Sequence, residues 1–491
     1  MRALSIAALA LAASLGACAL HPVGPDYRVP DVALANRPGA AAPFARAPAS
    51  AASAGSDAPF ADAPLPARWW RLYQDPRLDA LVEKALARNT DLRVALATLQ
   101  KAEAADRAVA GQGKPTLSAD FAPGFGHPSG LTYLAPNFVP PSGWQYEAGA
   151  SLSYQVDLFG RLQRAVEASR DDTQAAQAAL DLVRVNVAAG TARAYADACA
   201  SGLRIASAER STQLQQEALD ISVRLQRAGR VGITDAARAR SQLQVLEAAI
   251  PPLQARRQAA LYRLATLTGE LPQDFDRDVA ACTTPPRVTG TIPVGDGAAL
   301  LKRRPDIRQA ERQLAAATAT IGVATADLYP RVTLGLQAGS AGLGNDFLGK
   351  DSFSYNLGPL ISWSVPDTGV VRAHIAQASA GADAALAKFD GTVLAALRET
   401  QTALEVYARE LDRHAALQAA RDDSATVADQ ARRLYRSGRT GYLDALDAER
   451  GLAGSEATLA ASDAELADDQ VSLFLALGGG WEAAPGPQAS N

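Results

Sequence analysis

Residues 225–236 read LQRAGRVGITDA, and residues 434–445 read LYRSGRTGYLDA. The two stretches are identical at seven of their twelve positions and lie 209 residues apart. Each interrupts a long helical pattern with Gly-Arg-x-Gly, and a second helical pattern resumes behind an Asp. Glycine is favoured where a helix ends because it adopts a left-handed conformation without strain, and Asp is favoured where a helix begins. The stretches therefore predict two hairpin tips, at residues 228–235 and 437–444, in a chain built from two repeats.

The same order of elements is predicted around both tips. Each repeat reads as a helix, two strands, a long helix, a tip and a return helix. The predicted segments are a first repeat at 69–268 with strands within 115–158, a linker rich in Pro and Gly at 269–298, a second repeat at 299–480 with strands within 330–366, and a tail at 481–491. In the first repeat the long helix extends from Arg161 to Arg227, which is about 100 Å at the rise of an α-helix. Pro251 and Pro252 are expected to kink the return helix that follows.

The strand pattern is clearest between Trp144 and Leu158. Even-numbered positions there carry apolar side chains, and odd-numbered positions carry polar side chains or glycine. Successive side chains of a strand point to opposite faces, so this pattern predicts a strand with one apolar and one polar face. Four such strands in an open sheet would leave unpaired edges, which a lipid environment does not tolerate. We therefore expect several chains to contribute strands to one membrane β-barrel.

The long helices are not expected to lie in the membrane. A helix of about 100 Å is far longer than the hydrocarbon core of a bilayer, which is about 30 Å thick. Because their faces are also too polar for lipid, the helices are expected to project into an aqueous compartment as a helical tube. The alternative is a soluble coiled-coil protein with two small sheets, but that arrangement would leave the apolar strand faces exposed to water.

The N-terminus carries an export signal. Met1 and Arg2 precede an apolar run that ends in Leu15-Gly-Ala-Cys18. An apolar segment of this length followed by small residues is typical of a secretory signal peptide. Its ending resembles a bacterial lipoprotein signal, which predicts that residues 1–17 are removed and that Cys18 is lipidated. The alternative is ordinary cleavage, with no role for Cys18. Residues 18–68 are rich in Ala, Pro and Ser, and are expected to form an extended tether with little structure of its own.

The composition argues against several other classes of protein. The net charge is −4 and charged residues make up 20% of the chain, so no basic field for nucleic acid is expected. No stretch after Cys18 is apolar for long enough to form a transmembrane helix. The four histidines are scattered without the spacing of metal ligands, so we predict neither a metal nor a cofactor.

Several short motifs, distributed over nearly the whole chain, together resemble one family. They are the lipoprotein signal, Val23-Gly-Pro-Asp-Tyr27 with Pro30, Trp69-Trp70 with Asp75-Pro76, Asp157-Leu-Phe-Gly-Arg161, Arg303-Arg-Pro-Asp306 and Leu477-Gly-Gly-Gly-Trp481. This set resembles the NodT branch of the outer membrane factors, which are TolC-like efflux channels.

The resemblance implies a mixed α/β membrane protein that assembles as a homotrimer. Twelve strands, four from each of three chains, would form a barrel in the bacterial outer membrane, and a long periplasmic α-helical barrel would continue it. The implied function is that of the exit channel of a tripartite efflux system, exporting small molecules such as drugs or toxic compounds. The implied partners are a periplasmic adaptor, an inner-membrane pump of the resistance-nodulation-division class and outer-membrane lipid.

The resemblance also implies where such a channel is closed. Channels of this family close at their periplasmic tips, and the matching positions here are Leu443, Asp444, Asp447 and Arg450. The two aspartates lie three residues apart and so share one helix face. In a trimer they would place six carboxylates around a narrow lumen, where such rings favour cations. From spacing alone, a solvated face with an ordinary Asp–Arg pair remains the alternative.

The tips themselves are predicted to dock the adaptor. The residues concerned are Gly229, Arg230 and Gly232 at the first tip, and Gly438, Arg439 and Gly441 at the second. The two arginines would add positive charge at the far end of the helices. The alternative is that these glycines only serve the turn, as they would in any helical hairpin.

Cys199 and Cys282 form a possible disulfide. Cys199 lies 30 residues before Gly229, which corresponds to about 45 Å along a helix. Cys282 follows a return helix that climbs about 50 Å from the same tip. Because the two heights agree and the chain is exported, a bond between the linker and the long helix is feasible.

The sequence leaves three other functions to consider. Gly344–Lys350 nearly matches a phosphate-binding loop, but Asp351 replaces the Ser or Thr that binds magnesium. The segment also lies between two predicted strands rather than before a helix, so we interpret it as a surface loop and predict no enzyme. An exit duct for type I protein secretion and a non-channel coiled-coil structural lipoprotein are the remaining alternatives. The lipoprotein signal favours efflux over secretion.

Overall fold

The computed structural model describes residues 22–44, 59–127, 129, 139, 141–344, 347, 349–363 and 368–481. The predicted signal peptide, Cys18 and the tail after Trp481 lie outside these residues. The described residues form two compact units. Unit 1 falls within Met1–Pro30, Leu99–Ala176 and Ala310–Phe389, and unit 2 within Asp31–Thr98, Gln177–Gln309 and Asp390–Asn491. Each unit therefore takes segments from both halves of the sequence.

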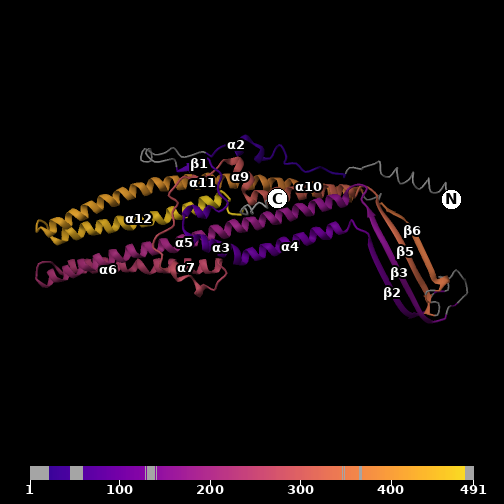
Figure 1. Cartoon of the computed structure of the whole chain (residues 1–491), viewed down its shortest axis with the longest axis horizontal. Coiled ribbons are helices and arrows are strands. Elements are labelled where there is room, and N and C mark those ends of the chain that lie inside the picture. The colour runs from indigo at the N-terminus through magenta and orange to yellow at the C-terminus, as the bar shows by residue number, and fades with distance from the viewer. Residues whose placement is uncertain are drawn as a thin grey trace, which may run out of the picture. The chain divides into compact units, whose positions relative to one another are not determined.

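A four-stranded antiparallel sheet dominates unit 1 (Figure 1). Its strands are β2 (Thr116–Gly126), β3 (Gly143–Val156), β5 (Arg331–Leu343) and β6 (Phe353–Ser362), in the order β2-β3-β5-β6. The strand register aligns side chains of one kind in several rows that cross the sheet. One row is Leu117, Leu152, Leu336 and Leu357, and the next is Ser118, Ser151, Gln337 and Asn356. The alternation read from the sequence thus yields one apolar and one polar face.

The sheet is open at both sides within the described part of the chain. Strands β2 and β6 each pair with one neighbour only, so each presents an edge with free backbone groups. The apolar face is largely uncovered, since Leu117 and Leu357 are each 73% exposed. Tyr146 differs from the other apolar positions because its side chain is buried beneath Phe347, at 4.8 Å between ring centroids. Its hydroxyl meets that of Ser340 at 2.7 Å.

Long helices connect the two units. They are α4 (Thr90–Gly111), α5 (Arg161–Arg227), α10 (Pro305–Ala326) and α11 (Thr368–Arg436). The bounds of α5 coincide with those predicted from the sequence. None of the described helices combines the length and the apolar character needed to cross a bilayer.

Unit 2 contains the two helical hairpins. The first joins α5 to α6 (Ile233–Ala248) and α7 (Ile250–Leu267), and the second joins α11 to α12 (Tyr442–Ala476). The kink predicted at Pro251 and Pro252 is present as a break between α6 and α7, where both prolines fall in the first turn of α7. The smaller elements are α3 (Pro76–Arg88), η4 (Pro272–Asp274), α8 (Arg277–Ala280) and α9 (Gly297–Arg303), and η6 (Lys350–Ser352) lies in unit 1.

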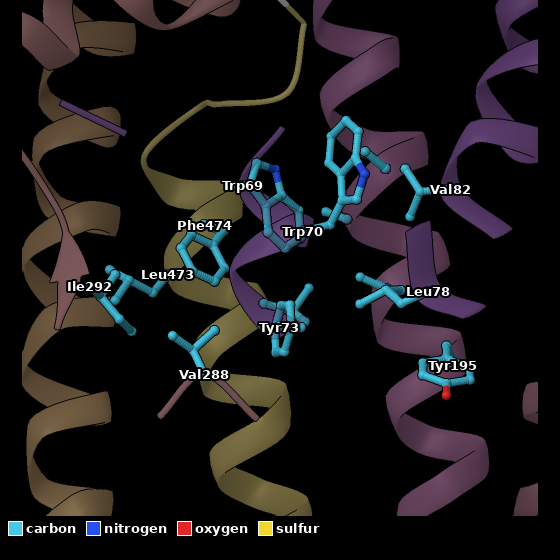
Figure 2. Close-up of a cluster of buried hydrophobic side chains, with 14 of the residues drawn as sticks. Trp69, Trp70, Tyr73, Leu78, Val82, Tyr195, Val288, Ile292, Leu473 and Phe474 are labelled. Atoms are coloured by element: carbon cyan, nitrogen blue, oxygen red, sulfur yellow. The ribbon is translucent and has the colours of Figure 1, made fainter. Parts of the chain in front are cut away.

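The core of unit 2 gathers around Trp69 (Figure 2). Trp69 lies in η2 (Trp69–Tyr73), is fully buried and stacks on Phe474 of α12 at 4.6 Å between ring centroids. Its indole nitrogen donates to the carbonyl of Gly479 at 3.2 Å. A Cβ at Gly479 would overlap the side chain of Leu65. Two of the sequence motifs, Trp-Trp and Gly-Gly-Gly, thus belong to one packed core.

The linker between the two halves is held against this core. Its segment β4 (Ile292–Pro293) pairs in parallel with β1 (Phe60–Ala61). The amide of the fully buried Gln470 forms two hydrogen bonds with the backbone of Val288, at 3.1 and 3.2 Å. The side-chain amide supplies the two hydrogen bonds that a neighbouring strand would otherwise supply. The backbone N–H and C=O of Val288 therefore keep hydrogen-bond partners although they are buried away from water.

The N-terminal tether differs from the expectation of little structure. Its described part contains η1 (Leu34–Asn36), α2 (Pro38–Ala41) and β1. Ala33, Phe44 and Leu65 are buried. These apolar side chains gain by leaving water, and the edge of β4 supplies backbone partners that the sequence pattern of the tether itself does not reveal.

Candidate functional site

The two tips have the same backbone geometry. Gly229 and Gly438 are left-handed, with φ of +69° and +71°. In the first tip, Arg230 N donates to Leu225 O at 2.9 Å and Gly229 N donates to Gln226 O at 3.0 Å. The second tip repeats both bonds, each at 2.9 Å, from Arg439 and Gly438. This pair of bonds satisfies the last carbonyls of a helix and requires a residue such as glycine that tolerates positive φ.

The return helices begin earlier than the sequence suggested. They start at Ile233 and Tyr442, so the turns occupy residues 228–232 and 437–441. Asp235 and Asp444 lie in the first helical turn rather than in front of it. Each carboxylate accepts from the backbone N–H of the preceding glycine, Gly232 or Gly441, at 3.2 Å. The aspartates therefore cap the helices from inside the first turn. Their negative charge also interacts favourably with the positive, N-terminal end of the helix dipole.

A groove of about 970 Å³ lies between the two hairpins in unit 2. It is lined by residues of α5, α6 and α12, with Asp235 and Arg238 contributed by the first hairpin. All four residues of the predicted gate line this groove: Leu443, Asp444, Asp447 and Arg450. The structure therefore brings the predicted gate residues together on one surface.

The residues of the predicted gate are exposed, and its charged side chains are not fully paired within the described residues. Leu443 is 50% exposed, and Asp444, Asp447 and Arg450 are exposed as well. Among the described residues, Asp447 and Arg450 form no ion pair, although their neighbour Glu449 pairs with Arg432 of α11. At the tips, Arg230 and Arg439 are likewise exposed, with no ion-pair partner in the described part of the chain. The exposed charges are available to a neighbouring copy or to a partner protein.

One contact between the two hairpins was not found from the sequence. The hydroxyl of Tyr442, the first residue of α12, donates to Glu217 of α5 at 3.4 Å, and its ring packs on Tyr435 at 5.1 Å between centroids. Burial and the Glu217 carboxylate raise the pKa of Tyr442 above its usual value, so the hydroxyl keeps its proton. The only signal in the sequence was the difference between the tips, because Ile233 occupies the equivalent position of the first tip.

Comparison with known proteins decides the family. The family model described as "Outer membrane efflux protein" matches residues 81–270 and 298–479. The chain belongs to the outer membrane efflux protein family. Members of this family are channel proteins of the outer membrane rather than enzymes, and the efflux protein described here is located there as well.

Individual relatives agree with this assignment. The efflux protein is 28% identical over 423 residues to Nodulation protein T of Rhizobium leguminosarum bv. trifolii, which covers 84% of this chain and 88% of the relative. It is 29% identical over 431 residues to the solvent efflux pump outer membrane protein SrpC of Pseudomonas putida, covering 83% and 86%. The solved outer-membrane channel OprN is 36% identical, with a TM-score of 0.81 over 94% of this chain and 99% of OprN.

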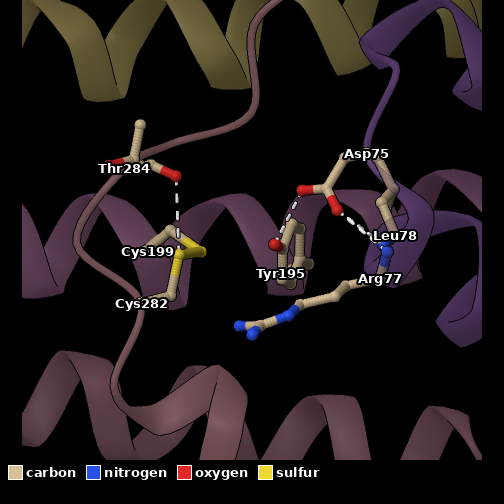
Figure 3. Close-up of a disulfide and its surroundings, with 7 residues drawn as sticks. All are labelled: Asp75, Arg77, Leu78, Tyr195, Cys199, Cys282 and Thr284. Carbon is tan, nitrogen blue, oxygen red and sulfur yellow. Dashed lines mark hydrogen bonds between the residues drawn. A yellow bond between two sulfur atoms is a disulfide. The ribbon is translucent and has the colours of Figure 1, made fainter.

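A disulfide joins the linker of the efflux protein to its long helix (Figure 3). Cys199 of α5 is fully buried, and its Cα lies 4.7 Å from that of Cys282. Gly202 lies one turn further along α5, and a Cβ there would overlap the carbonyl oxygen of Cys282. The glycine lets the linker approach the helix closely enough for the two cysteines to meet.

The described residues contain no group of three or more His, Cys, Asp or Glu that could hold a metal ion. The described part of the segment that resembles a phosphate-binding loop lies between β5 and β6 and includes η6, while residues 345, 346 and 348 lie outside the described residues.

An uncompensated carboxyl group lies farther along α12. Asp469 is half-buried and lines a cavity of about 590 Å³ between α5, the start of α10, α11 and α12. Burial, and then the nearby carboxylates of Asp468, Glu410 and Glu465, raise the pKa of Asp469 from 3.8 to about 6. Within the described residues Asp469 has no ion-pair partner, whereas its neighbour Asp468 meets Arg193 at 2.6 Å.

Asp469→Asn is expected to stabilise the efflux protein at pH 7.5 and to change little at pH 4. Because the folded pKa is above the unfolded one, the contribution of Asp469 to stability is highest below pH 3.8 and decreases as the pH rises to about 6. Thermal unfolding at several pH values measures the effect. Asp468→Asn is the matched control, and it should not stabilise at pH 7.5 because it removes the ion pair with Arg193. An equal gain for Asp469→Asn at both pH values would contradict this explanation.

Proposed function

We propose that this efflux protein is the outer-membrane exit channel of a tripartite system that exports small molecules, assembles as a homotrimer and closes at its tips. The observation that carries the proposal is the sheet of unit 1, which has an apolar face and two unpaired edges. In lipid, such edges are tolerated only when a barrel closes.

The topology of the sheet suits closure by identical copies. Its four strands alternate in direction, so the edges β2 and β6 run antiparallel to each other. Strand β6 of one copy can therefore pair with β2 of the next and continue the same antiparallel pattern. Four strands are too few to enclose a lumen, and three copies would supply twelve. The similarity to solved outer-membrane channels supports this arrangement.

The gate is proposed at the second tip. In a trimer, Asp444 and Asp447 would contribute six carboxylates around the axis, and Arg450 would hold the closed state by a charge-assisted bond to a neighbouring helix. Support comes from the exposure of these side chains and from the lack of an ion pair for Asp447 and Arg450 within the described chain. The contact between Tyr442 and Glu217 would hold α12 against α5 in the closed state.

The tips are proposed to dock a periplasmic adaptor, which would connect the channel to an inner-membrane pump of the resistance-nodulation-division class. The exposed Arg230 and Arg439 and the adjoining groove offer charge and shape for a helical partner. Lipidation of Cys18 would anchor the chain in the outer membrane. Two relatives support the efflux role and the anchor: SrpC is an outer membrane protein of a solvent efflux pump, and SilC of Salmonella typhimurium is described as a probable outer membrane lipoprotein.

A photo-crosslinking amino acid placed beside Gly438 tests the proposal. It should capture an adaptor, and the charge reversals Arg230→Glu and Arg439→Glu should abolish co-purification of that adaptor. Arg257→Glu on α7, remote from the tips and without an ion pair in the described chain, is the matched control and should preserve it. Adaptor binding that survives both reversals would refute docking at the tips. Capture of a protein-secretion complex would instead favour a type I exit duct.

A further inference from the structure

The residues Pro22–Tyr27, here called the strap, lie against unit 1 where β3 ends and α5 begins. The backbone N–H of Val23 donates to the carbonyl of Phe159 at 3.1 Å. The guanidinium of Arg164, in the first turn of α5, donates to the carbonyls of Val23 at 3.2 Å and of Gly24 at 3.3 Å. The strap is thus bound through its backbone, in the manner of an inserted peptide.

Arg164 is buried and its charge is matched by the strap. Its side chain is only 4% exposed and meets Asp26 of the strap at 2.6 Å and Glu167 of α5 at 2.7 Å. Burial alone would lower the pKa of Arg164, but the bonds to Asp26 and Glu167 raise it above its usual value. A buried cation of this kind is costly unless it is paired and hydrogen-bonded, so removal of the strap would leave Arg164 with unsatisfied donors.

Glycines on three segments make room for the strap. Gly24 has φ of +88°, and a Cβ there would overlap Gly322 of α10. Gly160 has φ of +74°, and a Cβ there would overlap Pro22. A Cβ at Gly322 would lie 2.8 Å from the carbonyl oxygen of Val23. The strap therefore fits closely between the start of α5 and the C-terminal part of α10.

A second interaction holds the C-terminal end of the strap. The Tyr27 ring lies under the guanidinium of Arg312, at 5.5 Å from the ring centroid, and Arg312 pairs with Asp171 of α5 at 3.2 Å. Burial, and then the Glu311 carboxylate, raise the pKa of Tyr27 to about 12. A cation over an aromatic face adds attraction at this partly buried position.

The surface that holds the strap, formed by Gly160, Arg164 and Gly322, is here called the seat. We propose that the seat fixes the lipid-bearing N-terminus beside the joint between β3 and α5, with Arg164 as the positioning residue. The inference rests on the proposed lipidation of Cys18 for what the seat holds. Cys18 precedes Pro22 by four residues, so the two are at most about 14 Å apart. The acyl chains are therefore kept at the end of the sheet where the helices begin, and the anchor and the sheet enter the membrane as one unit.

The seat is tested first without the lipid. An ordinary export signal replaces the lipoprotein signal, Cys18→Ser removes the lipid site, an epitope precedes His21, and a protease site is inserted between the exposed Asp31 and Val32. After cleavage of the folded full chain, the epitope-bearing fragment should stay bound. It should dissociate at least tenfold faster from Arg164→Met, and Arg164→Lys should restore part of the retention because it keeps the charge beside Asp26.

Two controls separate the seat from general stability. Arg161→Met removes a neighbouring ion pair, with Asp327 at 3.0 Å. Within the described residues it removes no hydrogen bond or ion pair with the strap, so it should retain the fragment as the parent does. Asp26→Asn alters a side chain that is 85% exposed, and it should speed dissociation even if Arg164→Met does not fold. Two outcomes would overturn the proposal. In one, the fragment dissociates from the parent protein immediately after cleavage; in the other, it dissociates from the parent protein and from Asp26→Asn at the same rate.

The position of the anchor is tested in the lipidated protein. A photoreactive fatty acid incorporated at Cys18 should crosslink mainly to peptides of the β3–α5 joint, and in Arg164→Met the crosslinks should spread over the chain. Equal crosslinking patterns would overturn the positioning role. Failure to incorporate any fatty acid would instead refute the proposed lipidation and leave the fragment-retention result as the measure of the seat.

Discussion

Replacing both Cys199 and Cys282 by serine is expected to destabilise the efflux protein strongly. The disulfide closes a loop with a sequence separation of 83 residues, for which the loss of chain entropy predicts about 4–5 kcal/mol. Thermal unfolding in detergent measures the effect as a lower unfolding temperature. The wild-type protein treated with a reductant should shift by a similar amount.

The linker explains why this effect should spread beyond the two sulfur atoms. Cys282 precedes the part of the linker that Gln470 binds at Val288 and that pairs with β1. Release of Cys282 should therefore loosen the linker where it packs on the core of unit 2. Proteolysis within the linker should accelerate in the double variant. The single variant Cys282→Ser, which leaves Cys199 buried and free, should behave like the double one. Unchanged unfolding in every variant and after reduction would show that the bond contributes nothing.

Replacing Asp447 and Arg450 by alanine is expected to open the proposed gate. If Arg450 holds the closed state through one charge-assisted hydrogen bond, its loss costs that state about 1.5–3 kcal/mol. Each 1.4 kcal/mol changes an equilibrium tenfold, so the open population should rise by about one to two orders of magnitude. Conductance of the purified protein in planar bilayers measures this directly.

The duplicated tip provides the matched control. Arg238 and Ser241 occupy the positions of the first tip that correspond to Asp447 and Arg450, at the same offset of 209 residues. Alanine at both of these positions should leave the conductance at the level of the wild type. An equal increase in both double variants would indicate general loosening of the hairpins, and no increase in either would refute the gate.

Patterns that depend on neighbouring residues in the chain were readable in the sequence. The helical pattern predicted the bounds of α5 that the structure shows. The alternation from Trp144 to Leu158 predicted an apolar face, and the sheet contains apolar rows such as Leu117, Leu152, Leu336 and Leu357. The rise of a helix placed Cys199 and Cys282 at similar heights above the tip, and the structure joins them. Each of these follows from fixed local geometry.

Features that depend on distant partners were not readable. Tyr146 is buried because Phe347 folds over it, and the tether is ordered because β4 and the core receive it. Arg164 carried no signal of its own, since a lone arginine in a helical pattern is usually solvated. The helix starts at Ile233 and Tyr442 were missed because the preceding glycine serves as the cap and the aspartate acts from inside the helix.

The open edges of the sheet have a genetic consequence. If the barrel closes only when each copy supplies both edges, a copy with a damaged β2 disables every ring that it enters. If the ring is the proposed trimer, a cell that makes normal and damaged copies in equal amounts would have about one ring in eight intact after random mixing. Such alleles would therefore be dominant. An allele that only prevents the channel protein itself from being exported would be recessive, because its product never enters a ring.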